Sequence, residues 1–357
     1  MTTTREARTN EAANGGAFSR AAAGLFPGYF ALVMATGIVS IAAYLLALTV
    51  VAWALVFVNV AAYAILWALL AVRLVRFFPR VRADLNDHAR GPGFFTVVAG
   101  TCVLGSQLLI VAGRDGVALA LWLAGALLWA VVMYAFFTFI TVREEKPTLE
   151  SGLNGTWLLA TVATQSVSVL GTLLAGSFGA YRETLLFLTL CMFLLGCMLY
   201  LLLITFIFYR FTFVNFTPIL LTPPYWINMG AVAITTLAGA RLIIAAPSWG
   251  LLADLLPFLK GFTLFFWAAG TWWIPLLFVL GFWRHVQKRF PLRYDPQYWG
   301  MVFPLGMYTV CTFQLSKAIG FEPLMLVPRC FVYLALAAWL AAFAGLAQTL
   351  LFKRADG

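Results

Sequence analysis

The side chains of this sequence that could do chemistry are small hydroxyls and glycines inside long apolar runs. In four runs a serine or threonine follows a pair of aromatic residues by about ten positions; these are Ser40, Ser106, Thr236 and Thr309. A fifth run carries Ser166 at the corresponding position. Ten residues of helix rise about 15 Å, which places such hydroxyls near the middle of a bilayer. Close helix packing explains any single one of them equally well. Five at one depth favour a ring of helices around a narrow polar path.

Glycines and other small polar residues on the same runs extend this predicted lining. Span five also carries Ser168 near the same depth. The full set of expected lining residues is Thr36, Gly37, Ser40, Gly105, Ser106, Gln165, Ser166, Thr236, Gly306 and Thr309.

Charged residues narrow the kind of solute that such a path could carry. All 13 acidic residues lie in loops or tails, and both histidines, His88 and His285, are expected on the cytoplasmic side. A cation site or proton relay normally places a carboxylate inside the membrane, so its absence argues against both. Arg241, Lys317 and Arg329 approach the membrane from the opposite side to the N-terminus. They either extend their charges to the headgroups or form an outer vestibule that concentrates anions.

Signatures of other functions are missing from the sequence. No His, Cys and Asp cluster has metal-ligand spacing, and there is no phosphate loop or nucleophile elbow. The 5 cysteines all lie in apolar runs, where packing explains them. The net charge of +10 resides mainly in loops, as membrane topology requires, and does not indicate nucleic acid. We therefore expect no enzyme, no metal and no cofactor.

The composition explains why these residues must be positioned by membrane helices. Of 357 residues, 63% are hydrophobic and 10% are charged, whereas soluble domains carry about 25% charged residues. A membrane helix needs about 20 apolar residues, and ten such runs are present. The predicted spans are 27–48, 50–76, 93–113, 116–142, 156–176, 184–209, 225–246, 261–286, 298–318 and 324–352.

The remaining residues form tails and loops whose charge predicts the orientation. Residues 1–25 are interpreted as a mobile cytoplasmic tail, residues 26–352 as one membrane domain and residues 353–357 as a short cytoplasmic tail. With the N-terminus inside, 17 of the 23 basic residues face the cytoplasm. This asymmetry predicts a multi-pass plasma-membrane protein with both termini cytoplasmic.

A repeat organises the spans into pairs. Every odd-numbered span opens with a similar tetrapeptide, at intervals of 65, 62, 69 and 73 residues; these begin at Pro27, Pro92, Asn154, Pro223 and Pro296. Proline suits a first helical turn, and the following aromatic pair suits the headgroup level. The sequence thus predicts an all-α membrane protein of ten helices. They would form five hairpins in a pseudo-fivefold arrangement around a central pore.

The sequence resembles the tellurite-resistance/dicarboxylate transporter family. The resemblance is strongest in residues 27–37 of the first span and residues 298–306 of the ninth. That family also contains slow-type guard-cell anion channels, malate permeases and sulfite exporters. The resemblance implies a homotrimer in which each subunit holds its own pore, lined by the odd-numbered helices. It also implies a phenylalanine gate beside a helix kink, and Phe303 followed by Pro304 matches that pattern. Without the resemblance, Phe303 would be taken as a packing residue.

The leading hypothesis is passive transport of small anions through a phenylalanine-gated pore in each subunit. Candidate anions are inorganic ions, C4-dicarboxylates such as malate, and oxyanions such as sulfite or tellurite. The alternative within transport is a proton-coupled or exchange carrier of the same dicarboxylates and oxyanions. A membrane-embedded enzyme or receptor is the alternative from another class, and no converging polar groups favour it.

Overall fold

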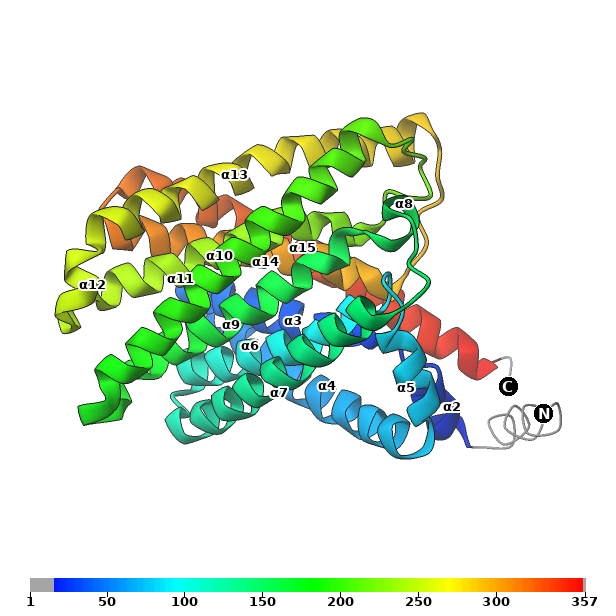
Figure 1. Cartoon of the computed structure of the whole chain (residues 1–357), viewed down its shortest axis with the longest axis horizontal. Coiled ribbons are helices and arrows are strands. Elements are labelled where there is room, and N and C mark those ends of the chain that lie inside the picture. The colour runs from blue at the N-terminus through cyan, green and yellow to red at the C-terminus, as the bar shows by residue number, and fades with distance from the viewer. Residues whose placement is uncertain (1–15, 356–357) are drawn as a thin grey trace.

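The computed structural model describes residues 16–355, with side chains through Leu351, and contains helices but no strands in that range. Figure 1 shows the long helices running in roughly the same direction through the molecule. In chain order they are α3 (Ala31–Leu45), α4 (Thr49–Arg76), α6 (Phe95–Ala112), α7 (Asp115–Val142), α9 (Leu159–Leu174), α10 (Arg182–Phe213), α11 (Ile227–Ala245), α13 (Leu256–Phe282), α14 (Trp299–Ile319) and α15 (Leu326–Ala355).

Short elements connect these helices. The short α-helices are α2 (Ala17–Ala23), α5 (Phe78–Leu85), α8 (Leu149–Gly152) and α12 (Gly250–Asp254). The 3-10 turns are η1 (Pro27–Phe30), η2 (Gly91–Phe94), η3 (Gly155–Leu158), η4 (Ala175–Tyr181), η5 (Pro223–Trp226), η6 (Ala246–Ser248), η8 (Pro296–Tyr298) and η9 (Glu322–Met325), and η7 (Trp283–Gln287) is a π-helical turn. Figure 1 places α2, α5, α8 and the last turns of α15 at one end of the molecule and α12 at the other.

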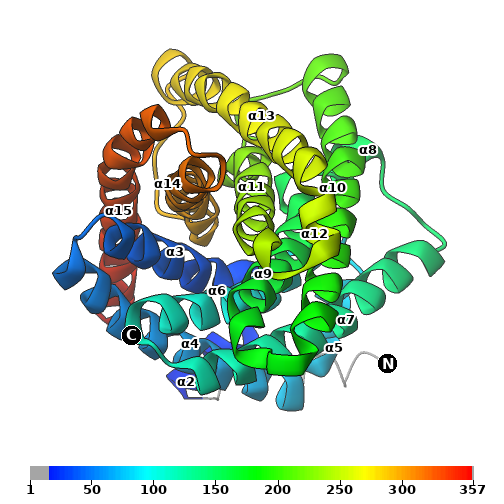
Figure 2. The same cartoon turned by 90° about the vertical axis from the view of Figure 1, so that its left-hand side faces the viewer.

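Five helices form the interior. In α3, α6 and α11, 83% of the most apolar stretch is buried, and nearly all of α9 and α14 is buried as well. Their contacts close into a ring: α3 packs on α6, α6 on α9, α9 on α11, α11 on α14, and α14 on α3. Figure 2, which views the molecule from one end, shows these five inside the other long helices.

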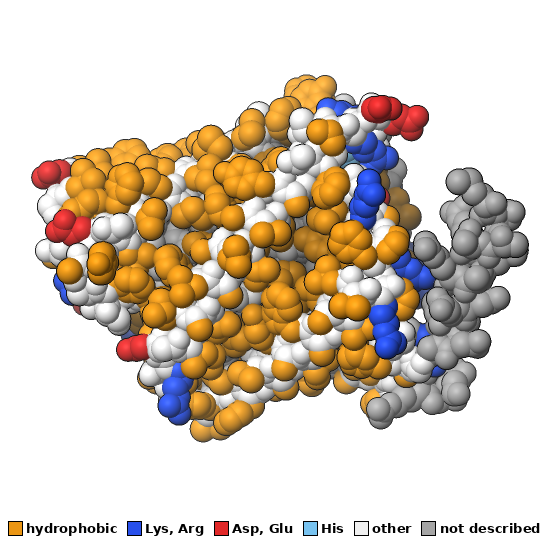
Figure 3. Space-filling model, turned by 60° about the horizontal axis from the view of Figure 1, so that its bottom comes forward, with side chains coloured by type: hydrophobic (Ala, Val, Ile, Leu, Met, Phe, Trp, Pro, Cys, Tyr) orange, Lys and Arg blue, Asp and Glu red, His pale blue; other side chains and the backbone are white. Residues whose placement is uncertain are grey.

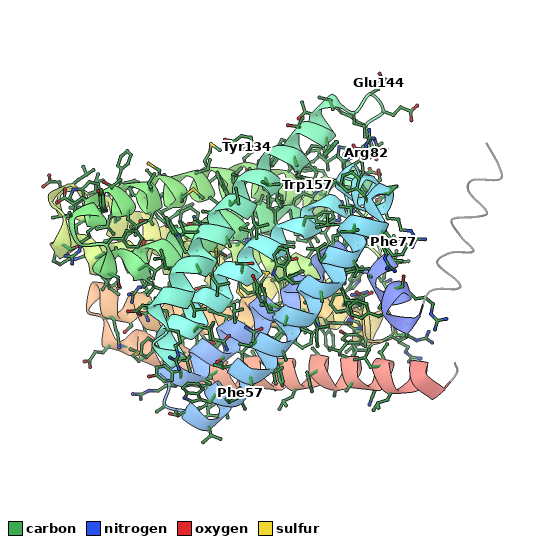
Figure 4. All side chains as sticks on the ribbon, turned by 90° about the horizontal axis from the view of Figure 1, so that it is seen from below. Phe57, Phe77, Arg82, Tyr134, Glu144 and Trp157 are labelled. Atoms are coloured by element: carbon green, nitrogen blue, oxygen red, sulfur yellow. The ribbon has the colours of Figure 1, made fainter. Side chains whose placement is uncertain are left out.

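The outer helices cover the joints of this ring and face outward. Helix α4 contacts α3 and α6, α7 contacts α6 and α9, α10 contacts α9 and α11, and α15 contacts α14 and α3. Only 17% to 28% of the apolar stretches of α4, α7, α13 and α15 is buried. Phe57 and Tyr134, about 70% exposed, lie on outward faces of α4 and α7 (Figure 4). Figure 3 shows the resulting hydrophobic band, with most charges at its two ends. Such a surface suits lipid.

Each inner helix begins with a 3-10 turn that the repeated tetrapeptide explains. Four of these turns have proline at their first positions, where the fixed φ angle favours helix initiation; they are η1, η2, η5 and η8. The turn η3 lacks proline, and Asn154 replaces it by accepting a hydrogen bond from the Thr156 N–H at 2.8 Å. The repeat seen in the sequence is therefore a set of five helix starts.

The five starting turns form a second ring at the end that carries α2 and α5. Turn η1 contacts η2, η2 contacts η3, η3 contacts η5, η5 contacts η8, and η8 contacts η1. Glycine permits the closest approaches. A Cβ atom on Gly93 would lie 2.8 Å from the Gly28 nitrogen, and one on Gly155 would lie 2.3 Å from the Pro224 carbonyl oxygen. We call these five turns the turn ring.

Eight helical segments in the described residues are long and apolar enough to cross a membrane. One of them, Gly155–Phe213, contains both α9 and α10, and α14 is not among the eight. The prediction of an all-helical integral membrane protein is confirmed. The number of ten spans and the fivefold symmetry stay predictions.

The tails differ from expectation where the structure describes them. Residues 1–15 and 356–357 of the predicted tails lie outside the described residues. Within the rest, α2 is helical, and its Ala22 and Ala23 are buried against the bundle. Helix α15 likewise continues to Ala355, beyond the predicted start of the C-terminal tail. Residues 17–25 therefore belong with the packed domain, because burial of these alanines and Leu25 fixes them to it.

Candidate functional site

The ring of inner helices encloses a cavity in the half of the bundle away from the turn ring. All five inner helices contribute to it, and we call it the axial cavity. Its volume is about 440 Å³, open space at its end included. Its lining consists of Ile38, Ile41, Cys102, Val103, Ser106, Ile110, Ser166, Val169, Leu173, Ile234, Leu237, Arg241, Met307, Val310 and Gln314.

A second cavity lies inside the turn ring, and we call it the turn-side cavity. Its volume is about 400 Å³ on the same basis. It is lined by Phe26, Gly28, Ala31, Met34, Gly93, Thr96, Thr156, Leu159, Pro224, Ile227, Gln297, Gly300 and Phe303. No residue lines both cavities, and none in either lining is acidic.

Phe303 lies at the boundary between the two cavities. Phe303 and Met34 line the turn-side cavity, whereas Met307 and Ile38, one helical turn further along the same helices, line the axial cavity. The Phe303 side chain is 1% exposed. Large apolar side chains on α14 and α3 therefore separate the two spaces, which is the place a gate would occupy.

Pro304 interrupts the hydrogen bonding of α14 beside that boundary. It lies inside the helix and has no N–H to donate, so the carbonyl of Gly300 loses its helical partner. Gly300 itself lines the turn-side cavity. On the neighbouring helix, a Cβ atom on Gly230 would lie 2.7 Å from Pro304 Cγ, so glycine lets α11 approach the proline ring closely.

Two of the predicted lining hydroxyls do line the axial cavity. These are Ser106 and Ser166. Each donates its hydrogen to the backbone of its own helix, to Cys102 O at 3.0 Å and to Val162 O at 2.7 Å. Their oxygen lone pairs, rather than their hydrogens, are thus left for other contacts in this conformation.

The other predicted lining residues lie outside both linings, most of them in contact with neighbouring helices. Ser40 donates to Ala52 O on α4 at 2.8 Å, and Gln165 donates to Phe193 O on α10 at 3.0 Å. Thr36 accepts from the Trp339 indole N–H on α15 at 3.0 Å. Each of these side chains therefore ties an inner helix to an outer one.

The three predicted lining glycines and the last two threonines serve packing or the backbone. Cβ atoms on Gly37, Gly105 and Gly306 would lie 2.8, 2.5 and 2.8 Å from side chains of adjacent helices. Thr236 and Thr309 donate to carbonyls one turn earlier in their own helices. Close packing, the alternative interpretation for any single small residue, describes these positions better.

The three predicted vestibule residues separate in the structure. Arg241 is half-buried, lines the axial cavity and donates from Nη1 to Gln314 Oε1 at 3.4 Å. Lys317 is exposed, with its ammonium 4.4 Å from the Phe313 ring centre. Arg329 is exposed on α15 and lines neither cavity. Arg241 is thus the charged residue of the axial cavity.

Sequence reasoning missed a third cavity beside the turn ring, which we call the mouth cavity. Its volume is about 780 Å³, open space included. It is lined by Phe26, Ala89, Arg90, Glu150, Ser151, Leu153, Asn154, Thr156, Arg210, Ile219, Leu220, Thr222 and Gln297. It shares Phe26, Thr156 and Gln297 with the turn-side cavity, so the two are adjacent.

Arginines near the ends of the outer helices recur at the same end of the molecule. Arg73 donates to Leu25 O, Arg143 donates to Asn86 O at 2.7 Å, and Arg210 donates to Glu150 O at 2.7 Å. Each carbonyl lies just before the starting turn of the same hairpin. We call these three contacts the hairpin ties. An arginine at the end of three successive even-numbered spans was the sequence signal that could have revealed them.

No three His, Cys, Asp or Glu side chains gather as a metal site would need, within the part of the chain that the structure describes. The path through the ring thus consists of apolar side chains, a few hydroxyls and amides, and one arginine.

Comparison with known proteins matches this architecture to a family. A family model described as voltage-dependent anion channel matches residues 25–347. Two uncharacterized transporters of Methanocaldococcus jannaschii are 24% identical over 301 residues and 26% identical over 306 residues, which is 82% and 83% of this chain and 85% of each relative. An uncharacterized membrane protein of Mycobacterium tuberculosis H37Rv is 41% identical over 129 residues, or 34% of this chain. That match spans 62% of the mycobacterial protein's length.

Proposed function

This chain belongs to the voltage-dependent anion channel family, and from that premise we propose that it conducts small anions passively across the cell membrane. The observation that carries the proposal is a pair of cavities enclosed by five buried helices and separated at Phe303. Candidate anions are chloride, nitrate, malate and other C4-dicarboxylates, sulfite and tellurite.

The proposed assembly follows the closed order of helix contacts. Ten membrane helices would form five hairpins in a pseudo-fivefold arrangement around one path, and three such chains would form a homotrimer. Both termini would be cytoplasmic in the plasma membrane. The last turns of α15 and helix α2 at the same end of the molecule support that arrangement (Figure 1). The turn ring would then surround the cytoplasmic mouth.

Selectivity for anions would come from charge and from the lack of carboxylates. Arg241 raises the local concentration of anions in the axial cavity, and no acidic side chain in either of these two linings repels them. The Ser106 and Ser166 hydroxyls would have to rotate away from their own helices before they could donate to a passing anion. Arg241 and the water that fills the opened path would therefore offset most of the free energy needed to dehydrate the anion.

The proposed gate is Phe303. Its ring closes a narrow apolar passage, which excludes both ions and water. Opening requires the ring to turn aside, and the missing hydrogen bond at Pro304 makes α14 easier to bend at that point.

Phe303→Ala tests the gate and the path together. Removal of the ring should raise the basal anion current several-fold, because the two cavities would then merge. The measurement is the current through purified protein in planar bilayers with chloride, nitrate and malate. Phe266→Ala is the matched control, because Phe266 is 0% exposed on α13 and lines neither cavity. A current that rises equally in both variants would indicate a general packing defect and contradict the gate.

A carrier is the second candidate, because two cavities on opposite sides of one constriction are also what a carrier presents. It would move C4-dicarboxylates or oxyanions coupled to protons or by exchange. If bilayers stay silent for both proteins while labelled malate or sulfite still enters liposomes in proportion to an imposed pH gradient, the carrier is favoured and Phe303 is a packing residue.

A further inference from the structure

We propose that the mouth cavity is an anion-loading site whose principal ligand is the guanidinium of Arg210. The proposal rests on the proposed function, because it places the site at the entrance to the same path. The observations that carry it are a buried cation that makes no ion pair within the described residues and a cavity that this cation lines.

Arg210 lies in the last turn of α10 and is 3% exposed. Its Nη2 donates to Glu150 O at 2.7 Å, and its Cζ lies 5.6 Å from the Phe216 ring centre and 5.8 Å from the Tyr225 ring centre. The buried Nε and Nη1 atoms have no hydrogen-bond acceptor among the described residues. A buried charge with unsatisfied N–H groups is costly unless a ligand completes its contacts.

The other arginines that form hairpin ties show what Arg210 lacks. Arg73 is equally buried at 3% exposure, and it pairs with Asp84 at 2.5 Å. Arg143 is exposed, so water solvates it. Arg210 combines the burial of Arg73 with the absence of an ion pair, because the ion pairs in residues 16–355 both involve Asp84. A bound anion would provide the counter-charge that Asp84 provides to Arg73.

The rest of the mouth cavity is suited to a small anion in transit. Arg90 adds a second guanidinium, which is partly neutralised because its Nε pairs with Asp84 at 2.8 Å. Thr222 and the second amide hydrogen of Asn154 can donate hydrogen bonds, whereas the Thr156 hydroxyl already donates to Asn154 Oδ1. Glu150 is the acidic residue of the lining; it is exposed, and its carboxylate makes no ion pair with Arg210. Its negative charge would keep anion binding weak enough for release, as conduction requires.

The site leads directly toward the gate. Thr156, Phe26 and Gln297 line both the mouth cavity and the turn-side cavity, and Phe303 lies at the far side of the latter. An anion held by Arg210 is therefore one cavity away from the gate.

The first experiment measures anion binding and does not depend on transport. The melting temperature of the purified full-length protein is followed as nitrate replaces gluconate at constant ionic strength. Nitrate should stabilise the wild type, and Arg210→Gln should abolish this shift. Arg143→Gln is the matched control, because it removes a hairpin tie outside the mouth cavity and should keep the full shift. Glu150→Gln should strengthen nitrate binding. A shift in Arg210→Gln equal to that of the wild type overturns the loading site.

Measurements of transport then distinguish the loading site at Arg210 from the proposed anion conduction. In a Phe303→Ala background, Arg210→Gln should raise the half-saturating nitrate concentration on the turn-ring side about tenfold, the usual size of one lost charge-assisted hydrogen bond. If currents persist with an unchanged half-saturating concentration, the loading site is wrong and conduction stands. If the nitrate-dependent shift is present but no current or flux is found, the site stands and conduction is wrong.

A second variant covers the case in which Arg210→Gln does not fold. Arg210→Lys keeps the charge and can still donate to Glu150 O, but it has fewer donors in a different geometry. Its nitrate affinity should fall at least about threefold, because a lysine cannot reproduce contacts from several guanidinium nitrogens. An unchanged affinity in this variant would equally overturn the proposal.

Discussion

Arg241 and Lys317 are both basic, yet the structure gives them different environments. Arg241 is half-buried in the axial cavity, whereas Lys317 is exposed beside Phe313. Salt screens exposed charges strongly, with a Debye length of about 3 Å at 1 M, and screens partly buried charges less.

Arg241→Gln should therefore lower anion flux at both low and high ionic strength, whereas Lys317→Gln should lower it at low ionic strength only. The double variant should lose more flux at low salt than at high salt, and the difference should equal the contribution of Lys317. Liposome uptake of nitrate at several ionic strengths measures all three. Equal sensitivity of the two single variants to salt would contradict this assignment.

His88 provides a pH test at a position between α5 and η2, outside the membrane-spanning helices. Burial lowers the pKa of His88 from its usual 6.5, and the positive charge of Arg143 lowers it further. The folded state therefore binds this proton more weakly than the unfolded state does. The contribution of neutral His88 to the stability of the fold is complete above pH 6.5 and is lost as the pH falls through the lowered pKa.

The expected result is a melting temperature that falls as the pH drops from about 7.5 to about 5, with a smaller fall in His88→Asn. Differential scanning fluorimetry of the purified protein measures both. The same pH dependence in the two proteins would show that other groups cause it.

The hydroxyls illustrate what sequence could and could not predict at the level of one residue. Spacing from the helix start predicts depth, because each residue rises 1.5 Å. It does not predict which way a side chain points around the helix axis, and neighbouring residues differ there by about 100°. Ser106 and Ser166 point into the axial cavity, while Ser40 at similar depth points to α4. Direction depends on which helices are neighbours, which the sequence does not state.

At the scale of elements, the turn ring brings backbone into close contact with backbone. Gly155 approaches η5 so closely that a methyl group would lie 2.3 Å from the Pro224 carbonyl oxygen, a backbone atom that cannot rotate away. Tetrapeptides that begin with proline predict these starts well, because proline and aromatic side chains act locally. The contacts between starts join turns that lie 60 or more residues apart and are not visible in any one tetrapeptide.

Gly155→Ala should destabilise the fold by about 1–3 kcal/mol, the usual cost of overpacking, and should disturb the turn-side cavity. Gly261→Ala is the control, since nothing lies within 4 Å of its Cβ position in α13 and alanine favours helix there. Unfolding of both variants in mixed micelles measures the difference. A Gly155 variant as stable as the Gly261 variant would show that the turn ring relaxes easily.

At the scale of the whole molecule, each chain contains its complete candidate path. The five inner helices of one chain close into a ring around the axial and turn-side cavities. The proposed trimer would therefore be a group of three independent paths. A trimer with one Phe303→Ala subunit should conduct about one third as much as a trimer with three, because closed symmetric oligomers repeat one subunit.

Native mass spectrometry gives the oligomeric state. Bilayer recordings of tagged mixed trimers give the conductance for each number of substituted subunits. Conductance that appears only when all three subunits carry the substitution would show a shared path instead. The division into inner and outer helices could be predicted because the repeated tetrapeptide precedes the odd-numbered spans and not the even-numbered ones. The five equivalent hairpins predict a closed ring, but the residues that meet between α14 and α3 could not be predicted, because these are the last and first inner helices of the chain.

The hairpin ties bear on how the protein is made. Arg73, Arg143 and Arg210 each bond a carbonyl that precedes the same hairpin in the chain, so no tie needs a segment that is synthesised later. A nascent hairpin can thus close its own charged end as soon as its second helix has emerged from the ribosome. The bundle would be assembled from hairpins that are already closed at the turn-ring end. Errors of membrane insertion would then be confined to single hairpins. The final step of assembly would be contact between the first and fifth hairpins.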